Sequence, residues 1–267
     1  QDDFDVEEAH NDIKAKGAIT KTGDIWKLGE HRLMCGDSTS AEDTEKLMDG
    51  TLADLSVTDP PYNVAYEGGT KDKLKIENDK MSDSAFHDFL VATFTCMHNA
   101  LKPGAANYVF FACKEARNFI DAYIHAGFLY KQLLIWVKNS ITLTRSDYQW
   151  QHEPVLFGWK KKGKHSWYTG RKESTIWEFD KPKKNGDHPT MKPIPLFDRL
   201  IRNSCPPDGI VFDPFGGSGT TLLACEQNGR TCWMVELDPR FIAVIIRRWE
   251  ALTGQKAEQI CGYCGCV

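Results

Sequence analysis

The chain has 267 residues, of which 41% are hydrophobic and 26% are charged, and this composition excludes a disordered, collagen-like or coiled-coil protein. No apolar run approaches the roughly 18 residues of a membrane span, and the acidic N-terminus does not resemble a signal sequence, so we expect a soluble cytoplasmic protein without a membrane partner. A net charge of −4 excludes a uniformly basic surface for nucleic acid and leaves only a local basic patch.

Short apolar runs alternate with amphipathic helical patterns, which is typical of an α/β fold with a mostly parallel sheet covered on both faces. Seven strands are expected, at Arg32–Cys35, Ala53–Thr58, Ala106–Ala112, Gln132–Val137, Pro154–Trp159, Ile210–Asp213 and Thr231–Glu236. Helices are expected after Ser82 as far as Lys102-Pro103-Gly104, and at Glu115–Ala126, Pro195–Ser204, Gly219–Gln227 and Pro239–Leu252.

The expected strands and helices leave a segment at each end of the chain. Residues 1–23 are expected to form an acidic N-terminal segment, residues 24–255 the main domain, and residues 256–267 a C-terminal tail. The tail carries Cys261, Cys264 and Cys266, but tetrahedral zinc takes four ligands and no fourth is near. We therefore expect no metal site.

An acid, two prolines and an aromatic residue, Asp59-Pro60-Pro61-Tyr62, follow the second expected strand. Open α/β sheets place their active sites at this end of a strand. Because the prolines remove two N–H donors, the loop offers carbonyl oxygens and one carboxylate, and such a set of acceptors suits an amino group. Tyr62 is suited to stack on a base that carries the amine. The alternative interpretation is a rigid turn that only closes the strand.

The stretch from Lys160 to Lys184 has little apolar periodicity, and its nine basic and three acidic residues give it a net charge of +6. Aromatic residues interleave with the cations, a combination that suits bases and phosphates together. The candidate DNA-binding residues are Lys160, Lys161, Lys162, Lys164, Trp167, Arg171, Lys172 and Trp177. A solvated surface hairpin with a few packed tryptophans is the alternative interpretation.

A glycine-rich turn, Asp213-Pro214-Phe215-Gly216-Gly217-Ser218-Gly219, separates an expected strand from an expected helix. Glycines allow close backbone approach, and a helix N-terminus favours an anionic group, so the turn suits a nucleotide-type ligand. It lacks the lysine of a phosphate-binding P-loop. Glu236 ends the next expected strand, where a carboxylate can bind two ribose hydroxyls. The alternative interpretation is that the glycine-rich turn and Glu236 each belong to an ordinary strand-to-helix connection.

Together, Asp59–Tyr62 and Asp213–Gly219 resemble the catalytic and cofactor motifs of the S-adenosylmethionine-dependent amino DNA methyltransferases. The catalytic motif comes about 150 residues before the cofactor motif, which is the order of the permuted beta group of that family. Smaller resemblances lie at Leu33–Ser38, Gln151–Phe157 and His188–Pro193, and Lys160–Asp187 falls where the family has its target-recognition segment.

The resemblance implies an α/β, Rossmann-like methyltransferase fold with a mostly parallel seven-stranded sheet, permuted motif order and a target-recognition insertion at about 160–187. It implies that Asp59 and the Pro60 carbonyl hold the target amine of a flipped-out base, that Pro61 stiffens the loop, and that Tyr62 stacks on the base. The residues implied for S-adenosylmethionine are Asp37, Ser38, Thr190, Lys192, Asp213, Phe215, Gly217, Gly219, Thr220 and Glu236. Residues 63–81 are expected to cover the base.

The resemblance also implies a site-specific enzyme of bacterial or phage type that acts on DNA, with a homodimer as a further expectation. Asp59 at the head of the catalytic motif favours adenine N6 over cytosine N4, where the family more often has serine. An RNA or protein-amide methyltransferase is disfavoured, because such enzymes usually carry asparagine first and keep the cofactor motif ahead. A non-catalytic DNA-binding relative is disfavoured because the acid and the glycines are both retained.

Overall fold

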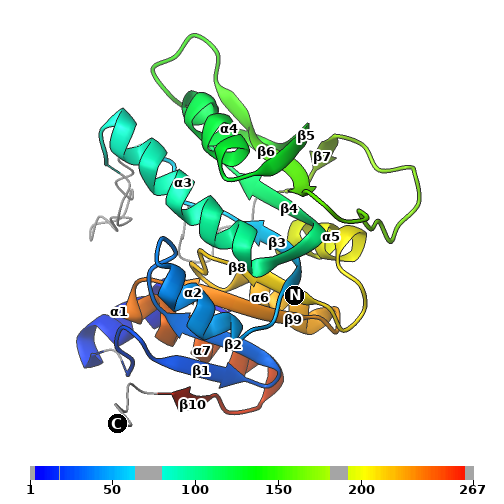
Figure 1. Ribbon diagram of the computed structural model, residues 1–267. Helices are drawn as coiled ribbons and strands as arrows, with labels where there is room; N and C mark the ends of the chain where they lie inside the picture. The colour runs from blue at the N-terminus through cyan, green and yellow to red at the C-terminus, as the bar shows by residue number, and fades with distance from the viewer. Residues whose placement is uncertain (1–3, 18, 64–79, 181–191, 262–267) are drawn as a thin grey trace.

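A computed structural model describes residues 4–17, 19–63, 80–180 and 192–261 (Figure 1). The described strands are β1 (Ile25–Leu28), β2 (His31–Cys35), β3 (Ala53–Thr58), β4 (Leu101–Phe110), β5 (Phe128–Thr142), β6 (Trp150–Lys160), β7 (Ile176–Glu178), β8 (Ile210–Asp213), β9 (Thr231–Glu236) and β10 (Glu258–Cys261). The described α-helices are α1 (Val6–Lys16), α2 (Ala41–Met48), α3 (Asp83–Ala100), α4 (Ala116–His125), α5 (Ile194–Ser204), α6 (Thr220–Gln227) and α7 (Pro239–Thr253).

All described strands form one sheet, in the order β10-β1-β2-β9-β8-β3-β4-β6-β5-β7. The five strands from β2 to β4 in that order are parallel, while β6 runs antiparallel to both β4 and β5. The seven expected strands are all present. The expected count of seven is nevertheless too low, because β1, β7 and β10 extend the sheet at its edges with four, three and four residues.

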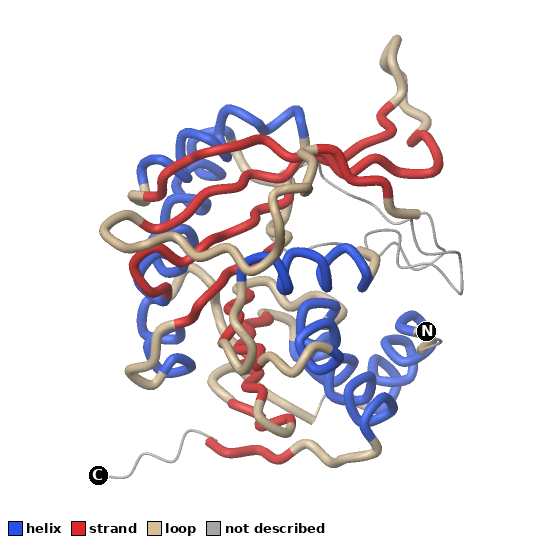
Figure 2. Tube along the Cα trace, turned by 90° about the vertical axis from the view of Figure 1, so that its right-hand side faces the viewer, coloured by secondary structure: helices blue, strands red, loops and turns tan. Residues whose placement is uncertain are grey.

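Helices cover both faces of the sheet (Figure 2). One face buries α5, α6 and α7 through residues such as Leu196, Leu222 and Ile242. The other face buries α2, α3 and α4 through residues such as Leu47 and Phe86. This arrangement confirms the predicted α/β class. Among the helices of the described residues, none combines the length and the hydropathy that a membrane span requires.

Helix α3 shows how the local sequence sets an element. Ser82 accepts a hydrogen bond from the Ala85 N–H at the first turn, which caps the helix. Phe86, Leu90 and Phe94 then recur at helical spacing and are fully buried. The helix ends as predicted near Pro103, but residues Lys102–Gly104 belong to the following strand, because β4 already begins at Leu101.

The ends of the chain are part of the fold. Helix α1 lies in the acidic segment 1–23, and Val6 and Ile13 bury themselves against Val244 of α7. The guanidinium of Arg247 also donates to the Asp12 carboxylate at 2.8 Å. At the other end, β10 pairs with β1. Residues 64–79 of the segment expected to cover the base, the Thr190 position and the end of the cysteine-rich tail lie outside the described residues.

Candidate active site

Four carboxylates lie at one edge of the sheet, each at the carboxyl end of a parallel strand. Asp37 follows β2, Glu236 ends β9, Asp213 ends β8 and Asp59 follows β3. These four strands are neighbours in this order, so residues nearly 200 positions apart in sequence line one edge. Ligands of open α/β sheets bind at this edge. The structure thus brings the two predicted motifs together.

Asp213 connects the two motifs through its carboxylate. Its Oδ1 accepts hydrogen bonds from the Thr58 hydroxyl at 2.9 Å and from the Phe215 N–H at 3.0 Å. Its Oδ2 accepts from the Thr221 hydroxyl at 2.5 Å. The residue is 2% exposed, and burial raises its pKa to about 7. The Asp213 carboxylate thus holds the glycine-rich turn against β3, and its contact with the cofactor stays a prediction.

The glycine-rich turn is open to solvent on one side and tightly packed on the other. A Cβ on Gly216 would lie 2.7 Å from the Met234 sulfur, whereas one on Gly217 would have no neighbour within 4 Å. Gly217 and Gly219 have φ values of +53° and +86°, which disfavour other residues. The open side can therefore accept a ligand next to the backbone.

Glu236 meets this turn from the neighbouring strand. Its Oε2 accepts from the Gly217 N–H at 2.7 Å, and its Oε1 accepts from the Asp238 N–H at 2.9 Å. Burial raises its pKa to about 7. Each oxygen keeps a second lone pair, so the carboxylate can still accept from a vicinal diol. These groups fit the nucleoside part of S-adenosylmethionine.

The other predicted cofactor residues differ in their accessibility. Asp37 is exposed, and its Oδ1 accepts from the N–H and the hydroxyl of Thr39, both at 2.8 Å. Phe215 is partly exposed, with its ring 6.0 Å from that of Phe89. Ser38 and Thr220 are 7% exposed, so their side chains offer little surface to a ligand.

The catalytic motif is held by contacts that the sequence did not predict. The Tyr62 hydroxyl donates to Asp59 Oδ1, and the Lys192 ammonium donates to Asp59 Oδ2 at 2.5 Å. Lys192 was expected at the cofactor. The structure instead places it on the proposed catalytic carboxylate. Pro60 is buried and Pro61 is partly buried, so the loop backbone is held in place around Asp59.

Glu153, at the start of β6, completes this cluster and was not among the predicted site residues. Its Oε2 lies 3.2 Å from Lys192 Nζ and accepts from the Tyr62 hydroxyl at 3.3 Å, while its Oε1 lies 2.5 Å from Lys138 Nζ. Burial would raise its pKa, but the two ammonium groups outweigh burial and lower it to about 2. The signals in the sequence were an acid before an apolar strand segment and the family resemblance at Gln151–Phe157, which assigned no role to Glu153.

Tyr62 is oriented through its hydroxyl. Its ring meets Phe119 edge-on at 6.4 Å and 77°, and Lys192 Nζ lies 5.4 Å from its centroid. Burial, together with the negative charge of Asp59, raises the Tyr62 pKa well above its usual value, so the hydroxyl stays a donor. Stacking of this ring on a base remains a prediction.

The predicted DNA-binding lysines lie at the opposite edge of the sheet. Because β6 runs antiparallel to β4, its first half, which includes Glu153, lies at the edge that carries Asp59, and it ends at the other edge with Lys160. Seven residues of strand at about 3.4 Å each separate the two positions by roughly 24 Å. Lys160 donates to the Leu101 carbonyl at 2.8 Å, and the exposed Lys161, Lys162 and Lys164 follow it. These four lysines are therefore far from Asp59.

The two tryptophans of this segment have different environments. Trp177 in β7 is 3% exposed and packs near Tyr108, so its side chain offers almost no surface to nucleic acid in this structure. Its burial follows from the pairing of β7 with β5, which adds the segment to the sheet. Trp167 is 37% exposed and donates to the Gly170 carbonyl at 3.1 Å. Arg171 and Lys172 are exposed, and a DNA contact by these three residues remains a prediction.

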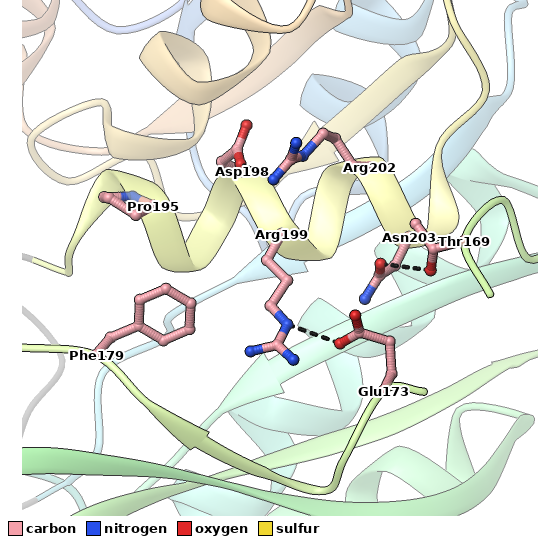
Figure 3. A pocket seen from close by; sticks show the side chains of 8 residues that line it. All are labelled: Thr169, Glu173, Phe179, Pro195, Asp198, Arg199, Arg202 and Asn203. Carbon is pink, nitrogen blue, oxygen red and sulfur yellow. Dashed lines mark hydrogen bonds and ion pairs between the residues drawn. The ribbon is translucent and has the colours of Figure 1, made fainter. Parts of the chain in front are cut away.

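A cavity of about 460 Å³ separates this segment from α5 (Figure 3). It is lined by Thr169, Glu173, Phe179, Pro195, Asp198, Arg199, Arg202 and Asn203. Both arginines are paired: Arg199 Nε lies 2.7 Å from Glu173, and an Arg202 nitrogen lies 2.7 Å from Asp198. These ion pairs balance the charge of the cavity; the pair of Arg199 with Glu173 attaches the segment to α5, whereas the pair of Arg202 with Asp198 lies within α5.

Residues 53–247 match the family model N6_N4_Mtase, which describes DNA methylases. The chain belongs to this DNA methylase family. DNA adenine methyltransferase YhdJ of Escherichia coli K12 is 26% identical to it over 240 residues, which cover 78% of this chain and 79% of that protein.

Two solved structures share the fold, which confirms the Rossmann-like methyltransferase class. The complex of M1.HpyAVI with S-adenosylmethionine has a TM-score of 0.60 and 24% identity, and covers 81% of this chain and 98% of that one. The cytosine-N4-specific PvuII DNA methyltransferase has a TM-score of 0.66 and 20% identity, and covers 85% of this chain and 90% of that one.

Within the described residues, no cluster of three or more His, Cys, Asp or Glu side chains is suited to a metal ion.

Proposed function

We propose that this DNA methylase transfers a methyl group from S-adenosylmethionine to the exocyclic N6 of adenine in DNA. The observation that carries the proposal is the position of Asp59 and Glu236 at one edge of the sheet, with the glycine-rich turn after β8 between them. Asp59 suits the amine and Glu236 suits the cofactor. Asp213 links the two halves through Thr58.

The turn after β8 and the end of β9 would hold the cofactor. Glu236 accepts the ribose hydroxyls, Gly217 leaves room for the ligand beside the backbone, and the exposed Asp37 lies one strand further along the same edge. When bound, S-adenosylmethionine supplies a sulfonium methyl group, and its sulfur keeps the electron pair of the broken S–C bond. Phe215 offers a partly exposed ring for an apolar or aromatic contact.

The Asp59 loop would orient the target amine. Its carboxylate and the Pro60 carbonyl accept the two N–H groups, which draws the nitrogen lone pair out of conjugation with the ring. The nitrogen then forms the new N–C bond and afterwards loses one proton, which Asp59 can accept. Because the proton leaves after attack, Asp59 acts mainly through position and charge. The base must leave the duplex, which costs a few kcal/mol.

Two observations support adenine over cytosine. The catalytic loop begins with Asp59, as the family pattern for adenine N6 favours, and YhdJ is named a DNA adenine methyltransferase. Cytosine N4 is the second candidate, because the PvuII enzyme with the same fold acts on that atom. The fold itself does not discriminate between the two bases.

Nucleoside mass spectrometry tests the proposal directly. DNA from a host without its own adenine methylation is digested after expression of the wild-type chain or the Asp59→Ala variant. We expect N6-methyldeoxyadenosine with the wild type and none with the variant. N4-methyldeoxycytidine in its place would establish the second candidate, and absence of both from DNA that is methylated by a control enzyme would contradict the proposal.

A further inference from the structure

Lys192 lies immediately before α5 and is 6% exposed. Its ammonium lies 2.5 Å from Asp59 Oδ2, 3.2 Å from the Tyr62 hydroxyl and 3.2 Å from Glu153 Oε2. An ammonium has three hydrogens, and these three oxygens can take all of them. Lys192 therefore has no donor left for a cofactor and acts on the catalytic loop instead.

We infer that Lys192 is a positioning residue for methyl transfer, which keeps Asp59 ionised and fixes its Oδ2 so that the carboxylate can accept the target amine. The inference rests on the proposed function. Glu153 in turn fixes Lys192, and Lys138 on β5 neutralises the second oxygen of Glu153 at 2.5 Å. Positive and negative side chains thus alternate across the site, in the order Lys138, Glu153, Lys192 and Asp59.

The charge on Asp59 needs this support. Burial raises the pKa of Asp59, and Lys192 opposes that rise, whereas the nearby Glu153 adds to it. The buried Asp213 faces Asp59 from β8, with the Thr58 hydroxyl between the two motifs. Without Lys192, the carboxylates of Asp59 and Glu153 would face one another in a partly buried site, and one would take up a proton.

A protonated Asp59 would be the wrong partner for an amine. A carboxylate accepts through both oxygens, but a carboxylic acid carries a hydrogen that would point at one of the amine N–H groups. The ionisation state of Asp59 therefore decides whether the loop can bind the target amine. Burial opposes charge on Lys192 as well, but Asp59 and Glu153 together raise its pKa, so the ammonium stays charged in neutral solution.

The first experiment measures the Asp59 pKa itself. In protein labelled with ¹³C at the aspartate carboxyls, the Asp59 signal is assigned by its loss in the Asp59→Asn variant and is titrated in the wild type and in three variants. Lys192→Met should raise the Asp59 pKa by about one unit or more. Lys192→Arg should keep it near the wild-type value, and Glu153→Gln should lower it because a neighbouring negative charge is removed.

Opposite shifts in Lys192→Met and Glu153→Gln cannot come from general structural damage. An unchanged Asp59 pKa in Lys192→Met would overturn the inference. If that variant does not fold, the same conclusion follows from Glu153→Gln failing to lower the Asp59 pKa.

The second experiment measures methyl transfer and cofactor binding in the same proteins. In Lys192→Met the acid limb of the single-turnover pH profile should move to higher pH, and Lys192→Arg should return it to the wild-type position. The dissociation constant of Lys192→Met for S-adenosylmethionine should stay within about twofold of the wild-type value. A large loss of cofactor affinity with an unchanged pH profile would assign Lys192 to the cofactor instead. If the pKa shifts occur but no DNA base is methylated by the wild type, the proposed function fails while the link between Lys192 and Asp59 stands.

Discussion

The two edges of the sheet carry charge in opposite ways. At the carboxyl edge of the parallel strands, Asp59, Glu153 and Lys192 are largely removed from water, and each touches at least one partner of opposite charge. At the other edge, Lys161 and Lys162 are exposed, close to the start of β4. At the first edge, Asp59 and Glu153 are paired with Lys192. At the second edge, Lys161 and Lys162 face solvent.

This difference separates charge density along the sequence from charge that is held in a defined geometry. Residues 160–184 have a net charge of +6, but the lysines at their start follow the end of β6 and so lie roughly 24 Å from the cluster around Asp59. The cluster has no net charge when Lys138 is included, yet burial gives each of its groups a defined geometry and partner.

The largest effect is expected at the centre of the buried edge. Asp59→Ala should lower single-turnover methyl transfer by roughly 10²–10³-fold or more, because the amine loses its charged acceptor. Binding of S-adenosylmethionine, measured by calorimetry, should change little, since Glu236 holds a different part of the site.

Lys161→Gln is the matched control for Asp59→Ala, because it removes one charge at the exposed edge. It should leave the single-turnover rate unchanged. Near-normal transfer by Asp59→Ala would mean that Asp59 is not the group that holds the amine. Equal losses of rate in both variants would mean that the buried edge and the exposed edge do not differ in their effect on methyl transfer.

A smaller effect is expected at Glu236. Glu236→Ala should weaken S-adenosylmethionine binding by about 1–3 kcal/mol, because the ribose hydroxyls and the Gly217 and Asp238 N–H groups lose their acceptor. Calorimetry on DNA-free protein measures this, with circular dichroism to confirm that the fold is kept. An unchanged dissociation constant would reduce Glu236 to a strand terminus.

Much of the fold and part of the site could be predicted from the sequence. Apolar runs and their turns located all seven main strands; β8 has only four residues, but the glycine-rich turn that follows marks its end. The strands β1, β7 and β10 have three or four residues and owe their pairing to neighbours in the sheet. The burial of Trp177 was missed for the same reason, since the pairing of β7 with β5 turns this side chain into the core while its neighbours Ile176 and Glu178 stay exposed.

The composition of the catalytic cluster could not be predicted. Asp59 and Lys192 are 133 positions apart, and their contact depends on where α5 begins relative to β3. Glu153 lies in a strand whose other signals are apolar, and only the antiparallel direction of β6 brings it to the catalytic edge. Spacing within a motif predicts neighbours in sequence, but it does not predict such contacts.

The raised pKa of Glu236 makes cofactor binding depend on pH. Burial raises this pKa to about 7 in the free protein, and ribose hydroxyls donate best to the ionised carboxylate. Binding should therefore favour loss of the proton, so the affinity for S-adenosylmethionine should rise by about tenfold from pH 6 to pH 8. Titration calorimetry at several pH values measures the slope.

Glu236→Gln is the control for this pH dependence, since the amide does not titrate. Its cofactor affinity should be lower and nearly flat across the same range. Asp213 also has a pKa of about 7, but it remains in this variant, so any slope that it causes would persist. Equal slopes in the wild type and the variant would show that Glu236 is not the titrating group.

The smallest effect is expected at the exposed edge. The variant in which Lys161, Lys162 and Lys164 are replaced by glutamine tests whether these side chains touch DNA phosphates. Each phosphate contact contributes roughly 0.9 to the slope of log affinity against log salt, so three contacts would lower the slope by about 2.7. Because β6 carries these lysines away from Asp59, we expect the slope to fall by less than the roughly 0.9 that one contact contributes. Fluorescence anisotropy with duplex DNA at several salt concentrations measures this slope. A fall near 2.7 would mean that the duplex reaches this edge of the sheet, and the segment would then contact DNA as its charge suggests.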